Sequence, residues 1–154
     1  MKGSENLTNK ILKYLSCMLA CCILLQTTAL ATNAIEPQAS LYIAGTHVNI
    51  TANSNGGLLI SFSVSCLDEM TEAGATTIYL YEDNGNTEKC VKTYRCTDRD
   101  YEYILGKNTD YYGSNVSYNG IIGCDYYATV YLKAENNTGS DTVIATTRTV
   151  TARK

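Results

Sequence analysis

The sequence predicts an all-β fold in which seven to eight antiparallel strands form a β-sandwich behind an N-terminal signal peptide. Three observations lead to this prediction. Apolar and polar residues alternate with a period of two in several segments, as in strands with one buried face. Turn residues separate these segments at short intervals, which is typical of sandwiches. The composition, with 13 Tyr, 11 Gly and a single Pro in 154 residues, suits an ordered β domain.

A basic and then apolar N-terminus indicates export. Lys2, Lys10 and Lys13 precede a twelve-residue apolar run at 14–25, and Ala29-Leu30-Ala31 has the small residues of a cleavage site. A membrane span needs about 20 apolar residues, so this run is too short to remain as an anchor. We therefore expect a secreted, extracellular protein with no stable membrane span after cleavage. Whether it stays at the cell surface, and whether it is a lipoprotein, are left open.

The domain boundaries follow from that cleavage site. Residues 1–31 form the predicted signal peptide, residues 32–39 a short N-terminal segment, and residues 40–154 the domain. After residue 31 the chain keeps nine Lys and Arg against fourteen Asp and Glu, which gives a net charge of −5. This charge argues against a nucleic-acid partner and against docking on anionic membranes. The sequence offers no cofactor motif, and no cofactor is expected.

The first half of the domain has the clearest strand signals. Four strands are expected there, at residues 41–51, 58–66, 76–82 and 89–94. Gly45 interrupts the first of them, which indicates a bulge. The turn at 83–86, with Asn84-Gly85 at its centre, predicts a hairpin between the last two.

The second half is less regular. Between the second and third strands, residues 69–75 are expected to form one helical turn. Farther along, we expect a short edge strand at 98–105, a loop at 107–115, and strands at 116–119, 126–134 and 143–152.

One segment resembles the sixth strand of fibronectin type III domains. In residues 123–130, as in that strand, a Gly precedes a polar residue and a Tyr, and alternating apolar residues follow. The resemblance implies an immunoglobulin- or fibronectin III-like sandwich in which the hydroxyl of Tyr126 bonds the backbone at a sheet corner. The sequence departs from the pattern in two places. Ile122 stands where Pro is usual, and Phe62 takes the place of the core Trp.

The domain also resembles a family of small secreted proteins of gut clostridia. The similarity runs from about residue 40 to residue 152. The segments that carry it are residues 57–62, 73–82, 91–94 and 126–128. No activity is assigned to that family, so the resemblance implies secretion and a sandwich and leaves the function open.

Four cysteines remain after removal of the signal peptide. In an exported chain such cysteines indicate disulfides, and no C-x-x-C pair suggests a zinc site. In a sandwich with this strand order, Cys66 and Cys96 fall at one pole and Cys90 and Cys124 at the other. We therefore predict the bridges Cys66–Cys96 and Cys90–Cys124, with a local Cys90–Cys96 bridge as the alternative.

A tyrosine-rich segment is the most suggestive feature for binding. Tyr101, Tyr103, Tyr111 and Tyr112 lie close together in the sequence among Asn and Asp residues. Flat rings beside fixed hydrogen-bonding groups are typical of sugar-binding and protein-binding surfaces. The alternative is structural, because Tyr also favours strands for its β-propensity.

No catalytic constellation is found in the sequence. The only histidine, His47, is expected at a surface position in a strand, without a nucleophile beside it. A weak signal for carboxylate catalysis comes from three acids expected in one loop, Asp68, Glu69 and Glu72. A weak signal for calcium binding comes from three acids expected on one strand face, Asp98, Asp100 and Glu102. We expect no catalytic residue and no metal site.

These observations favour a secreted, non-catalytic binding or structural module. Its partner would be an extracellular protein or glycan, as in adhesion. Two alternatives stay open: a small secreted hydrolase that uses paired carboxylates, and a secreted effector or toxin-like protein.

Overall fold

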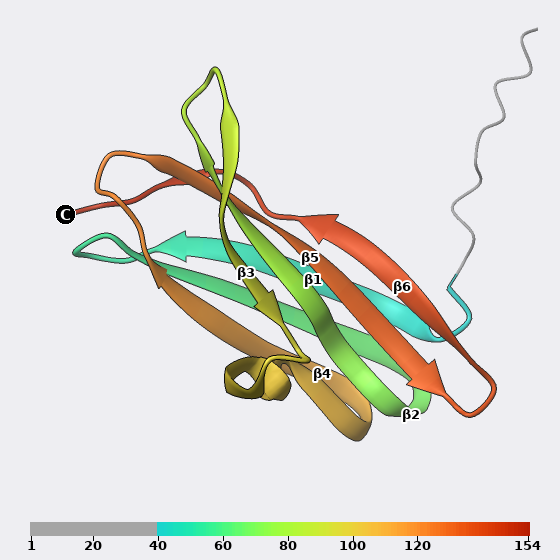
Figure 1. The fold of residues 1–154 in the computed structure, drawn as a ribbon. Helices are drawn as coiled ribbons and strands as arrows, with labels where there is room; N and C mark the ends of the chain where they lie inside the picture. Colours follow the sequence, from blue (N-terminus) through green and yellow to red (C-terminus); the bar gives the residue numbers. More distant parts are fainter. Residues whose placement is uncertain (1–39) are drawn as a thin grey trace, which may run out of the picture. The chain divides into compact units, whose positions relative to one another are not determined.

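The computed structural model describes residues 40–154, so the predicted signal peptide and the segment 32–39 lie outside the described residues. The all-β class is confirmed. The described part contains seven strands and one short 3₁₀ helix, connected in a single antiparallel network (Figure 1). In chain order they are β1 (Ile43–Ala52), β2 (Gly57–Asp83), β3 (Glu88–Arg95), η1 (Arg99–Ile104), β4 (Leu105–Asn119), β5 (Asp125–Asn136), β6 (Gly139–Thr146) and β7 (Val150–Thr151).

The long strand β2 organises the fold. Its first half pairs with β1 on one side and with β4 on the other. Its second half pairs with β3 and β5, and β5 in turn pairs with β6 and β7. The register shifts between Ser65 and Met70, and the residues between them are mostly exposed. β2 thus passes from one group of strands to the other through an irregular stretch.

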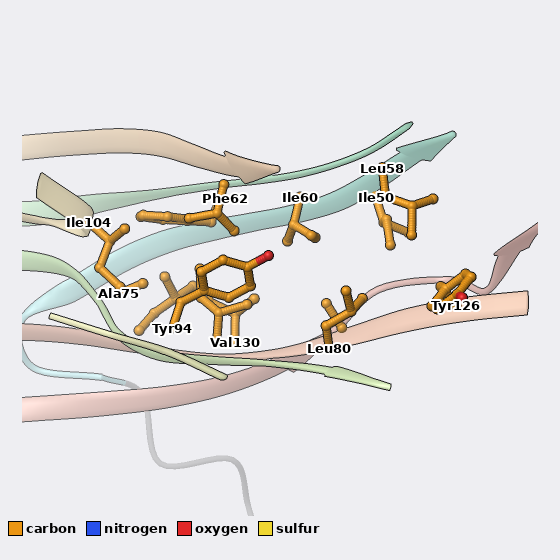
Figure 2. Close-up of a cluster of buried hydrophobic side chains, with 14 of the residues drawn as sticks. Ile50, Leu58, Ile60, Phe62, Ala75, Leu80, Tyr94, Ile104, Tyr126 and Val130 are labelled. Atoms are coloured by element: carbon orange, nitrogen blue, oxygen red, sulfur yellow. The ribbon is translucent and has the colours of Figure 1, made fainter. Parts of the chain in front are cut away.

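The core lies between these two groups of strands. Figure 2 shows side chains of β1 and the first half of β2 facing side chains of the second half of β2, β3 and β5. From the first group come Ile50, Leu58, Ile60 and Phe62, and from the second come Ile78, Leu80, Tyr94, Tyr126 and Val130. Their alternation along each strand puts every second side chain into this core and the intervening ones outside. Assignment to the immunoglobulin or fibronectin III type stays a prediction.

Several local predictions are confirmed. The register of β1 shifts between Ile43 and Gly45, where the bulge was expected. The hairpin of β2 and β3 turns at Gly85, whose φ of 75° suits glycine and whose amide donates to the Asp83 carboxylate at 2.7 Å.

The closing strand predicted at 143–152 is not continuous, because this stretch is divided between β6 and β7.

Three predictions are wrong. Residues 69–75 form no helical turn, because β2 continues through them with β4 on one side and β5 on the other. The expected edge strand at 98–105 is mostly the helix η1, and the expected loop at 107–115 is part of β4. Backbone pairing with β2 holds this polar segment in a strand, although few of its side chains are buried.

Candidate functional site

The structure divides the four tyrosines predicted to bind a ligand. Tyr101 and Tyr103 lie on η1, and Tyr111 and Tyr112 lie on β4. The ring of Tyr101 packs edge-on against buried Tyr94, with 5.0 Å between ring centroids. The ring of Tyr112 covers Gly106 so closely that no Cβ would fit there. These two rings therefore serve packing, whereas Tyr103 and Tyr111 are 48% and 59% exposed.

The hydroxyl groups of Tyr103 and of Tyr94, on neighbouring β3, also satisfy main-chain carbonyls of β4. Among residues 40–154, β4 pairs only with β2, so its other edge has no strand partner in the described domain. Tyr94 donates to the carbonyl of Ser117 at 2.9 Å, and Tyr103 donates to that of Asn115 at 3.4 Å. Such contacts protect an edge that would otherwise be free to pair with another chain. Much of the tyrosine-rich segment is thus used within the domain.

A second group of tyrosines lies on the outer face of β2 and β5. This group, here called the tyrosine row, consists of Tyr79, Tyr81, Tyr127 and Tyr131. Tyr81 and Tyr127 are cross-strand partners with rings stacked at 5.0 Å and an interplanar angle of 13°. The ring centroid of Tyr79 lies 6.4 Å from that of Tyr81 and 5.8 Å from that of Tyr131, which it contacts edge-on. The four rings form one continuous, half-buried aromatic surface.

The surroundings of the tyrosine row are mainly uncharged. Thr93 of β3 and Thr129 of β5 flank Tyr79 on its two sides, and Thr146 of β6 shares a hydroxyl–hydroxyl hydrogen bond of 3.2 Å with Thr129. Exposed Ile144 lies opposite Tyr131. The middle of this face thus offers rings and hydroxyl groups, with charged side chains only towards its ends.

One end of the row lies near a carboxylate. Burial, and then the nearby Glu88 carboxylate, raise the pKa of Tyr127 to about 12. The row was not predicted from the sequence, although its signal is present there. Tyr79 and Tyr81, like Tyr127 and Tyr131, stand at alternate positions of predicted strands, where an outward-facing side chain is normally small or polar.

A cleft of about 530 Å³ opens where β2, β4 and β5 approach η1. It is lined by Glu72, Thr76, Cys96, Thr97, Glu102, Leu105, Lys107 and Lys133. The Lys133 ammonium group lies 3.2 Å from the Glu72 carboxylate and also contacts that of Glu135. The hydrogen bonds to Glu135 and then Glu72 raise the pKa of Lys133, although burial opposes this. This lysine is therefore a protonated structural group.

Cys96 is the only thiol of the cleft lining. Burial, and then the charge of Glu72, raise its pKa, so the thiol stays protonated near neutral pH. A protonated thiol is a poor nucleophile, and no histidine lines the cleft. The cleft thus lacks an activated nucleophile.

The structure also places the other residues considered for catalysis or metal binding. His47 is exposed on β1. Asp68 and Glu69 are exposed at the irregular stretch of β2, while Glu72 turns into the cleft. These three acids thus form no common site.

The geometric basis for a calcium site is wrong. Asp98 precedes η1, and Asp100 and Glu102 lie within it, so these acids do not alternate along one strand face. Across residues 40–154, no three metal-ligating side chains gather in a group that could hold an ion.

The predicted disulfides are absent, because all four cysteines of the described domain are free thiols. For Cys90–Cys124 the reason is lateral distance. Cys90 pairs with Tyr81 of β2, and Tyr81 pairs with Tyr127 of β5, so Cys90 and Tyr127 are two strand spacings apart. Cys124 lies three residues farther along, which makes a separation of about 14 Å, well beyond the limit of about 7 Å.

The pair Cys66 and Cys96 fails for a different reason. Each packs against a different hydrophobic cluster, Cys66 beside Val64 and Met70, and Cys96 beside the main core. Both thiols serve as small apolar groups that fill space.

Tyr126 is fully buried at the start of β5. Its hydroxyl accepts a hydrogen bond from the amide of Ile121 at 2.9 Å and donates one to the Glu82 carboxylate, also at 2.9 Å. These bonds tie the 120–124 loop to β2. Burial raises the pKa of this hydroxyl to about 12, and the hydrogen bond with Glu82 adds to this.

Comparison with known proteins adds no relative. No protein-family model matches the chain, and no curated protein is similar to it. Within residues 40–154 there is no helix of the length and apolar character needed to cross a membrane.

Proposed function

We propose that the protein is a secreted, non-catalytic binding module whose ligand lies across the tyrosine row. One observation carries this proposal: four tyrosine rings form a continuous surface on the outer face of β2 and β5. Tyrosine supplies a large, flat contact area at a low cost in side-chain entropy, and its hydroxyl adds a hydrogen bond. The partner class that suits such a surface is an extracellular protein or glycan.

The location of the row supports a binding role. β2 and β5 are inner strands with partners on both sides, and their opposite faces are packed into the core. Binding groups on such rigid elements lose little freedom when a ligand is bound. The predicted export of the chain agrees with a partner outside the cell.

The test is a binding screen with the protein from residue 32 onward. Glycan arrays, peptidoglycan and extracellular proteins serve as probes for the unaltered protein and for two variants. Tyr79→Ala/Tyr131→Ala alters the row, and Tyr111→Ala removes an exposed tyrosine of β4 as the matched control. Saturable binding that the double variant loses and the control retains supports the proposal.

Three results would overturn it. Binding that survives in the double variant discards the row as the site, and binding that only Tyr111→Ala abolishes returns the site to the predicted segment. If none of the probes binds the unaltered protein, the assignment as a protein- or glycan-binding module is rejected.

A further inference from the structure

We infer that the cleft between β2, β4, β5 and η1 binds a small zwitterion, an amino acid or short peptide with a free amino group and a free carboxylate. This site is separate from the tyrosine row and does not depend on it. Its volume of about 530 Å³ lies in the range of about 300–1,000 Å³ that is usual for small-molecule sites.

The charges of the lining indicate this ligand class. Of its two lysines, Lys133 is already bound to two carboxylates. Lys107 lies across from Glu72 in the pairing of β4 with β2, yet no ion pair of Lys107 or of Glu102 is formed with any residue of the described domain. The cleft thus holds one cation and one anion that are free to meet charges of a ligand.

The remaining lining completes the argument. Thr76 and Thr97 bring hydroxyl groups, and Leu105 and the protonated thiol of Cys96 bring apolar surface. A ligand carboxylate would bind Lys107, its ammonium group would bind Glu102, and its side chain would pack on Leu105. A purely anionic ligand would leave Glu102 unmatched and would be repelled by it, and a purely cationic ligand would leave Lys107 unmatched in the same way. Only a ligand with both charges is complementary to both groups.

The experiment is a titration of the amide-labelled protein from residue 32 onward with L-alanyl-L-alanine at millimolar concentration, followed by NMR. Two blocked probes are compared with it, N-acetyl-dialanine, which lacks the ammonium group, and dialanine amide, which lacks the carboxylate. We expect dialanine to shift the amide signals of Thr97 and Leu105. Each blocked probe should bind about tenfold more weakly, since each lacks one charged hydrogen bond.

Two substitutions of exposed residues test the contributions of Lys107 and Glu102 one at a time, and a third substitution is the control. In Lys107→Gln, dialanine and its amide should bind equally, and in Glu102→Gln, dialanine and its acetyl derivative should bind equally. Lys89→Gln changes an exposed residue of β3 outside the cleft, and this variant should bind as the unaltered protein does. Equal binding of all three probes to the unaltered protein, or no shift at Thr97 and Leu105, would overturn the inference. Neither result bears on the tyrosine row.

Discussion

Replacing Tyr126 with Phe removes one oxygen atom from the interior of the domain and leaves the ring in place. The ring is fully buried and lies 6.1 Å from that of Tyr118, and a Cβ added at Gly120 would come within 2.8 Å of it. The packing therefore stays nearly unchanged in Tyr126→Phe. What is lost are the hydrogen bonds to the Ile121 amide and the Glu82 carboxylate, both 2.9 Å long.

The expected cost follows from these two bonds. A hydrogen bond to a charged group contributes about 1.5–3 kcal/mol, and a buried amide left without an acceptor costs about 1–3 kcal/mol. Glu82 is only half-buried and Ile121 is exposed, so water replaces part of both lost bonds. We expect the free energy of unfolding to fall by about 2 kcal/mol and Tm to fall by about 8 °C.

Urea unfolding followed by far-ultraviolet circular dichroism measures this change. The midpoint should fall while the slope with urea stays constant, since the surface exposed on unfolding is the same. The matched control is Tyr118→Phe, which removes a neighbouring hydroxyl with no hydrogen bond to the described residues, and it should change stability by less than about 0.5 kcal/mol. If Tyr126→Phe is as stable as this control, the reasoning about the buried hydroxyl is refuted.

Three further predictions concern packing, thiols and pH. Gly106→Ala should lower the free energy of unfolding by about 1–3 kcal/mol, because the new Cβ displaces the Tyr112 ring; unaltered urea stability would contradict this. Alkylation of the native protein followed by mass spectrometry should label exposed Cys90 first, since the other three thiols are partly buried, and equal labelling of all four would be a contrary result. Stability should be complete below about pH 10 and fall as pH rises through about 12. The reason is that the unfolded chain loses its Tyr protons near pH 10, whereas the pKa values of Tyr126 and Tyr127 are raised to about 12 in the folded protein; an unchanged urea midpoint from about pH 9 to about pH 11.5 would contradict this.

The strands that could be predicted are those whose pattern is decided locally. Residues 58–66 of β2 and 126–134 of β5 each have one face in the core, so a buried apolar residue stands at nearly every second position and the strand shows in the sequence. The hairpin at Gly85 is equally local, because its turn requires a positive φ that glycine adopts easily.

Only the end of β4, residues 116–119, could be predicted, because the stability of the rest comes from tertiary pairing. Gly106 and Val116 are its only buried residues, so residues 107–115 have the composition of a loop. The strand exists because β2 offers it backbone partners along most of its length. In the same way, Met70 and Ala73 are spaced as on one face of a helix. They are nevertheless buried side chains of strand β2, just after the shift in its register with β4.

The tyrosine row depends on a register that no local pattern contains. The density of tyrosines along the chain points to residues 101–112. The row instead joins two strands far apart in the sequence, where Tyr81 faces Tyr127 and Tyr79 lies diagonal to Tyr131. If one strand shifted by one residue in this pairing, its two tyrosines would turn to the core side of the sheet. The row therefore exists only with the native register.

In this register the side chains of the row contribute little to the stability of the domain. Ile78 and Leu80 alternate with Tyr79 and Tyr81 on β2, so the side chains of the core and those of the row point to opposite faces of one strand. A cross-strand aromatic pair contributes only about 0.2–1 kcal/mol, which is small beside the burial of the core residues. Removal of Tyr79 and Tyr131 should therefore leave the domain folded. A loss of binding in that variant then reports a lost contact with the ligand and not an unfolded sheet.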